Sequence, residues 1–121
     1  MSAAKRILFV DDDDSIREFV TMALADEGYE VLTAPHGAAA LEILGRDTPA
    51  LILLDMRMPI MDGWSFLKAY QEVPAPHAPI IALTASRNTL ESQVPPDVNG
   101  FLAKPFDLDE LIELVEKYVN P

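Results

Sequence analysis

The sequence predicts an α/β domain in which a five-stranded parallel sheet lies between two layers of helices. Short apolar runs alternate along the chain with segments whose apolar residues recur at helical spacing. One run, Ala-Leu-Ile-Leu-Leu at 50–54, is apolar at every position, which is typical of a parallel strand buried on both faces. The 121 residues suffice for one hydrophobic core. We therefore expect a single domain over residues 1–121.

Five short runs rich in branched or aromatic apolar residues are the expected strands. They are residues 7–10, 31–33, 50–54, 80–83 and 101–103. Each is too short for a typical helix, and helical segments separate the first four. Because parallel strands need such returning connections, the alternation supports a parallel sheet.

The first expected helix follows the acidic run Asp-Asp-Asp-Asp at 11–14. Its apolar residues recur at helical spacing and should share one face; they are Ile16, Phe19, Val20, Ala23 and Leu24. Asp14 or Ser15 is the expected N-cap, and Gly28 the stop signal.

Four further helical segments have different degrees of support. Residues 38–44 favour helix by intrinsic propensity, and a third helix should start near Gly63. The last helix has capping-box spacing at 107–110 and a regular apolar face. The segment 86–99 should carry a fourth helix, but Pro95 and Pro96 interrupt it, so we expect a short helix or an irregular loop.

Composition excludes several classes of function. The chain has 9 Lys and Arg against 20 Asp and Glu, a net charge of −11, which argues against nucleic-acid binding. The absence of cysteine excludes a disulfide scaffold, a thiolate zinc site and a cysteine nucleophile. No apolar run approaches the ~18 residues of a membrane span, and the first residues do not resemble a signal peptide. We expect a cytoplasmic protein without membrane contact.

Polar side chains directly follow four of the expected strands. Asp11 and Asp12 follow the first, Asp55 the third, Thr84 the fourth and Lys104 the fifth. In open α/β sheets, reactive groups gather at the carboxyl ends of the strands, next to the point where the strand order reverses. We therefore expect these five side chains to meet in one site.

Three carboxylates in one cleft repel each other unless a cation lies among them. Oxygen ligands without histidine or cysteine favour Mg²⁺, or Mn²⁺ in its place. A carboxylate beside such a metal can act as a nucleophile towards phosphorus. Lys104 would then neutralise charge on the phosphoryl oxygens, and Thr84 would donate a hydrogen bond.

Four segments resemble the receiver domain of two-component response regulators, along nearly the whole chain. They are 7–13 (Ile-Leu-Phe-Val-Asp-Asp-Asp), 53–63 (Leu-Leu-Asp-Met-Arg-Met-Pro-Ile-Met-Asp-Gly), 82–85 (Ala-Leu-Thr-Ala) and 101–106 (Phe-Leu-Ala-Lys-Pro-Phe). The resemblance is to single-domain, chemotaxis-type receivers without an output domain. It implies a flavodoxin-like, doubly wound sheet with strand order 2-1-3-4-5 and helices on both faces.

The resemblance also implies a role for each site residue. Asp55 matches the phosphoacceptor, and Asp11 and Asp12 match the acidic pair that binds Mg²⁺. The main-chain carbonyl of Arg57 matches a further metal ligand, and Lys104 matches the phosphate-pairing lysine. Thr84 matches the switch hydroxyl, and Phe101 matches the aromatic whose rotamer changes with the position of that hydroxyl. The resemblance also implies a cis peptide bond from Lys104 to Pro105. Phe101 is expected to be a core aromatic.

Arg57 and Ser86 occupy two positions whose residues vary in the family, and this variation is linked to the lifetime of the phosphoryl group. The Arg57 side chain should shield the group from water and slow its hydrolysis. The expected partners are a sensor histidine kinase or phosphotransfer protein that supplies the phosphoryl group, and a downstream protein target. The protein should be a monomer or weak dimer, a signalling switch and not a turnover enzyme.

Two alternatives stay open on the residues alone. A phosphatase of the haloacid-dehalogenase type would use Asp11 or Asp13 as its nucleophile, although its second acidic pair and cap have no place in 121 residues. A flavodoxin-like binding protein would need a phosphate-cradling loop, which is not evident. His36 and His77 are isolated, and we assign them no role.

Overall fold

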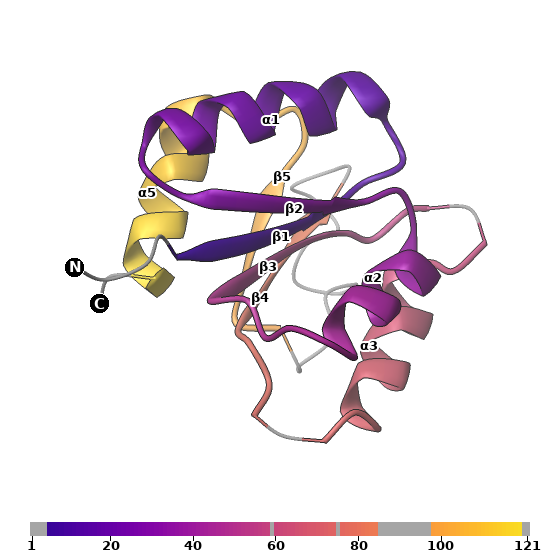
Figure 1. Cartoon of the computed structure of the whole chain (residues 1–121). Helices are drawn as coiled ribbons and strands as arrows, with labels where there is room; N and C mark the ends of the chain where they lie inside the picture. Colours follow the sequence, from indigo (N-terminus) through magenta and orange to yellow (C-terminus); the bar gives the residue numbers. More distant parts are fainter. Residues whose placement is uncertain (1–4, 59, 75, 85–97, 120–121) are drawn as a thin grey trace.

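The computed structural model describes residues 5–58, 60–74, 76–84 and 98–119. Five parallel strands form one sheet in the order β2-β1-β3-β4-β5, as predicted (Figure 1). Their bounds are Arg6–Val10 for β1, Glu30–Ala34 for β2, Leu51–Asp55 for β3, Ile80–Thr84 for β4 and Gly100–Ala103 for β5.

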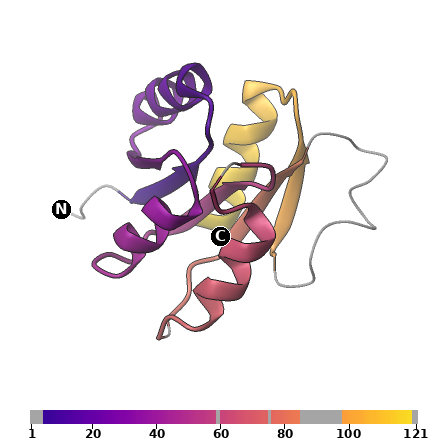
Figure 2. The same cartoon turned by 90° about the vertical axis from the view of Figure 1, so that its right-hand side faces the viewer.

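Four described helices cover the two faces of the sheet. They are α1 (Asp14–Asp26), α2 (Gly37–Leu44), α3 (Gly63–Gln71) and α5 (Leu108–Val119). Helices α1 and α5 lie on one face and α2 and α3 on the other (Figures 1 and 2). The expected fourth helix falls largely on residues 85–97, outside the described residues. None of the described helices is long and apolar enough to cross a membrane.

The strands divide their side chains between two apolar cores. In β1, Ile7 and Phe9 pack with Val20 of α1 and the apolar face of α5. The alternate residues Leu8 and Val10 pack with α2 and α3. Strand β3 alternates in the same way, and all five of its residues are buried. Burial on both faces explains why the run 50–54 is apolar throughout.

Three local predictions were wrong. The N-cap of α1 is Asp13 and not Asp14 or Ser15, and its carboxylate accepts hydrogen bonds from the main-chain nitrogens of Ser15 and Ile16. Phe19 is 56% exposed, although its spacing placed it on the buried face of α1. Phe101 is 43% exposed because β5 is an edge strand, so it is not a core aromatic.

Candidate functional site

The strand register brings the predicted site residues to one edge of the sheet. Val10, the last residue of β1, pairs with Leu54, so Asp11 and Asp55 occupy equivalent places at the ends of neighbouring strands. Thr84 pairs with Ala103, and the main-chain nitrogen of Lys104 donates to the carbonyl of Thr84 at 2.6 Å. The carboxyl ends of β1, β3, β4 and β5 thus deliver all of these groups to one place.

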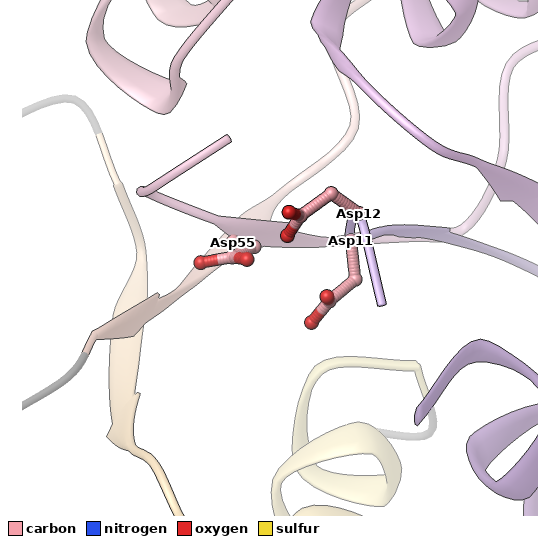
Figure 3. Close-up of side chains that lie close together, drawn as sticks. All are labelled: Asp11, Asp12 and Asp55. Atoms are coloured by element: carbon pink, nitrogen blue, oxygen red, sulfur yellow. The ribbon is translucent and has the colours of Figure 1, made fainter. Parts of the chain in front are cut away.

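Three carboxylates form the centre of this edge. Asp11, Asp12 and Asp55 each offer an oxygen, and these oxygens all lie within 4.8 Å of one another. Figure 3 shows the three side chains side by side, from the ends of β1 and β3. Asp11 is fully buried and Asp55 is 5% exposed, whereas Asp12 is exposed. The cluster is therefore anchored in the protein and open to solvent on one side.

Each buried carboxylate is held at both of its oxygens. The Oδ1 atoms accept main-chain N–H groups two residues further on, from Asp13 to Asp11 at 2.9 Å and from Arg57 to Asp55 at 3.1 Å. The Oδ2 atoms face Lys104, whose Nζ lies 2.6 Å from Asp11 and 3.3 Å from Asp55. Such paired constraints leave these two side chains little rotational freedom.

The environment raises the pKa of two groups in the site. Burial raises the pKa of Asp55, helped by the nearby charge of Asp11, while the Arg57 N–H and Lys104 oppose the rise. For Lys104, burial alone lowers the pKa, but the hydrogen bond to Asp11 and the charges of Asp55 and Asp11 outweigh it and leave the pKa raised. The ammonium is thus kept charged between two acids, and further positive charge would favour ionised Asp55.

Thr84 contributes a hydroxyl without a partner. Its Oγ1 is buried and makes no hydrogen bond within the described part of the chain. Buried hydroxyls are normally bonded, and an unmatched one costs free energy. Its position at the end of β4, the strand next to Asp55, leaves a donor available to a group bound at Asp55.

The remaining predicted residues surround the cluster. The peptide bond from Lys104 to Pro105 is cis. Arg57 is exposed and lines an open hollow of about 440 Å³ with Asp12 and Trp64. Phe101 lies on the outer edge strand β5, and Ser86 lies outside the described residues.

Comparison with known proteins identifies the family. A family model for the response regulator receiver domain matches residues 7–116. The chain belongs to the response regulator receiver family. Receiver domains serve as phosphoacceptor switches in two-component signalling, together with histidine kinases or phosphotransfer proteins. The matches support neither the phosphatase nor the flavodoxin-like alternative.

Individual relatives agree with this receiver assignment. The chain is 35% identical to sporulation initiation phosphotransferase F of Bacillus subtilis, over 95% of this chain and 94% of that protein. It is 41% identical to the DNA-binding transcriptional regulator NtrC of Escherichia coli, over 92% of this chain but only 24% of NtrC. The structure of response regulator TrrA of Thermotoga maritima, solved with Mg²⁺ and BeF, superposes with a TM-score of 0.83 at 35% identity, covering 94% of this chain and 98% of TrrA.

The acidic cluster of this receiver domain fits a hard divalent cation. Its donors are carboxylate oxygens from two strand ends, and neither histidine nor cysteine belongs to the cluster. The cluster borders the hollow that Asp12 and Arg57 line, which leaves room for water molecules and phosphoryl oxygens. Mg²⁺ prefers this combination of one or two carboxylates with water and phosphate.

Two contributions to the site were missed by the sequence interpretation. Asp13 was given no part in the receiver site, yet its main-chain N–H donates to the carboxylate of Asp11. Arg17 was given no role, yet its Nη1 donates to the main-chain carbonyl of Asp11 at 2.5 Å. The sequence spacing of Asp11, Asp13 and Arg17 makes both contacts feasible, but the directions of the Asp11 and Arg17 side chains decide whether they form.

Proposed function

We propose that Asp55 of this receiver domain accepts a phosphoryl group from a phosphohistidine on a sensor kinase or phosphotransfer protein. The observation that carries the proposal is the placement of Asp55 between two sets of groups. Strand β3 lies between β1 and β4, so Asp55 has Asp11 on one side and Thr84 on the other. Lys104 contacts Asp55 and Asp11 at once.

This placement selects Asp55 over the other two acids as the acceptor. A phosphoryl group on Asp55 would lie near both the acidic cluster and the hydroxyl of Thr84. Asp11 follows β1, which is separated from β4 by β3, and it is fully buried. Asp12 is exposed and does not contact Lys104 in the described structure. Of these three acids, only Asp55 contacts Lys104 and also follows the strand next to β4, which ends at Thr84.

In the transfer, a carboxylate oxygen of Asp55 attacks phosphorus and forms the new O–P bond. The N–P bond of the donor breaks, and the imidazole leaves with the electron pair of that bond. The residues that would hold Mg²⁺ are Asp11, Asp12, Asp55 and, through its main-chain carbonyl, Arg57. When bound, the ion would supply positive charge that offsets the negative charge of the acids and the phosphoryl oxygens. Lys104 neutralises further charge through its ammonium group. The domain thereby assists its own phosphorylation.

The signal follows from the hydroxyl of Thr84, which has no hydrogen-bond partner among the described residues. A phosphoryl oxygen on Asp55 supplies the acceptor that Thr84 lacks, so the phosphorylated state favours a conformation in which this bond forms. Thr84 pairs with Ala103, two residues after the half-exposed Phe101 on β5. A shift at Thr84 is therefore transmitted to a surface aromatic, where a downstream protein target can detect it.

Phosphorylation with acetyl phosphate and Mg²⁺, followed by intact-mass measurement, tests the proposal. Wild-type protein should gain one phosphoryl group, and the gain should disappear with EDTA or in Asp55→Asn. Asp26→Asn, which removes an exposed acid at the end of α1, should label like the wild type. Labelling that survives in Asp55→Asn but is lost in Asp13→Asn would overturn the proposal in favour of the phosphatase.

A further inference from the structure

Arg17 connects helix α1 to the turn that carries two of the three clustered acids. Its side chain is 17% exposed and reaches back over the first turn of α1. Nη1 donates to the main-chain carbonyl of Asp11 at 2.5 Å, and Nη2 pairs with the carboxylate of Asp14. One side chain thus bonds to both ends of the segment 11–14.

Arg17 acts on a short segment that other bonds also hold, among them the Asp13 N–H and the Lys104 ammonium on the Asp11 carboxylate. Between the end of β1 at Val10 and the start of α1 at Asp14 lie only three residues, and two of them, Asp11 and Asp12, belong to the acidic cluster. The main-chain nitrogen of Asp11 donates to the carbonyl of Ala34 at 3.1 Å. The bond from Arg17 fixes the other side of the same residue, and with it the direction in which the chain continues to Asp12.

The two contacts of Arg17 differ in how much each contributes to stability. Asp14 is 90% exposed, and exposed ion pairs contribute little because water screens them. Asp11 is fully buried, and a charge-assisted bond to a buried carbonyl is stronger and is costly to lose. The planar guanidinium can make both contacts at once, which a lysine ammonium cannot reproduce in the same geometry.

We infer that Arg17 is a positioning residue for the divalent-cation site: through the carbonyl of Asp11 it holds the 11–14 turn so that Asp11 and Asp12 face Asp55. This inference rests on the proposed Mg²⁺-dependent function. It makes a prediction opposite in sign to that of simple electrostatics. Removing a positive charge near a cation site should tighten Mg²⁺ binding, whereas losing the position of two ligands should weaken it.

Calorimetric titration of Mg²⁺ into the metal-free protein separates the two effects. Arg17→Gln should bind Mg²⁺ about tenfold more weakly than the wild type, the size of effect usual for groups that orient metal ligands. Arg17→Lys, which keeps the charge, should recover only part of the loss. Arg46→Gln removes an equal charge from an exposed site after α2 and should match the wild type. Unchanged or tighter binding by Arg17→Gln would overturn the inference.

Two further measurements keep the test specific. Asp14→Asn should bind Mg²⁺ like the wild type; a loss equal to that of Arg17→Gln would assign the effect to the exposed ion pair and overturn the inference. In metal-free Arg17→Gln, the amide of Asp13, which is bonded to Asp11, should exchange faster with solvent while amides in the centre of β3 keep their protection. Unchanged exchange at Asp13 would contradict the positioning role.

Different experimental results would contradict the role of Arg17 and the proposed function. If the wild type neither binds Mg²⁺ nor labels at Asp55, the proposed function is wrong whatever Arg17 does. If the wild type does both, a positioning role predicts that Arg17→Gln labels slowly at low Mg²⁺ and approaches the wild-type rate at saturating Mg²⁺. A lower rate that saturating Mg²⁺ does not restore would contradict it.

Discussion

Substitution of Lys104 by methionine removes the only cation that contacts both buried carboxylates in the described structure. The ammonium lies 2.6 Å from Asp11 Oδ2 and 3.3 Å from Asp55 Oδ2. Methionine has a similar length and keeps the apolar stem, so the change acts mainly on charge. Without the ammonium, no positive side chain in the described structure contacts the two largely buried carboxylates, since the Arg17 guanidinium reaches the main-chain carbonyl of Asp11 and not its carboxylate.

The size of the effect follows from these distances. Two unit charges at the 4.8 Å limit of the cluster repel by about 3.5 kcal/mol at an effective dielectric of about 20. Removal of one partner of a buried ion pair usually costs about 3–5 kcal/mol. Lys104 is 23% exposed, so solvent screening reduces the cost, and we expect a loss of about 2–3 kcal/mol. For a chain of this length, that loss lowers Tm by about 10 °C.

Thermal unfolding followed by circular dichroism in EDTA and in Mg²⁺ measures this effect. Lys104→Met should unfold well below the wild type in EDTA. Added Mg²⁺ should raise its Tm more than that of the wild type, because the cation replaces the lost charge and no longer competes with the ammonium for Asp11. Lys68→Met removes an exposed lysine of α3 and should unfold like the wild type. Equal Tm values for Lys104→Met and wild type in EDTA would refute the reasoning.

Three further predictions concern individual side chains. Asp55→Asn should stabilise the metal-free protein at neutral pH, because the raised pKa of Asp55 means that folding disfavours its ionised form. The gain in the free energy of unfolding, measured with urea, should vanish as the pH falls below the pKa of Asp in the unfolded chain, about 3.9. A gain that grows at low pH would have the wrong sign. Thr84→Val removes a buried hydroxyl without a described partner, so stability should be unchanged or rise by up to about 1 kcal/mol. Labelling at Asp55 should persist, but the change in amide exchange of β5 that accompanies labelling should be lost. A clear loss of stability would show that the hydroxyl is bonded. Arg57→Ala should shorten the lifetime of the phosphoryl group after the donor is removed, because the exposed side chain beside Asp12 no longer shields it from water; an unchanged lifetime would count against shielding.

Most of the fold follows from patterns that are local in sequence. Alternating apolar runs and helical spacings predict the strands and the layers, because burial on both faces demands apolar residues throughout β3. Exposure at the edges depends on neighbours from distant parts of the chain. Phe19 has the spacing of a buried residue, yet it lies at the rim of an apolar groove with Pro105 and Phe106. Periodicity identifies a face of a helix, but not how far its neighbours cover it.

The composition of the site was predictable for a similar reason. Parallel strands end at one edge, so Asp11, Asp55, Thr84 and Lys104 could be brought together before any coordinates were known. The contacts that hold them were not predictable, because they depend on side-chain direction and on cap geometry. The bond from Arg17 to the Asp11 carbonyl is one example, and the bond from the Asp13 N–H to the Asp11 carboxylate is another.

The identity of the phosphorylated carboxylate is the most direct test of the proposed function. Treatment of acetyl phosphate-labelled protein with borodeuteride reduces an aspartyl phosphate to the corresponding alcohol, and peptide mass mapping then locates the modified position. We predict modification at Asp55 alone, dependent on Mg²⁺, with Asp11 and Asp12 unmodified. Modification at Asp11 or Asp12, with Asp55 unchanged, would contradict the account.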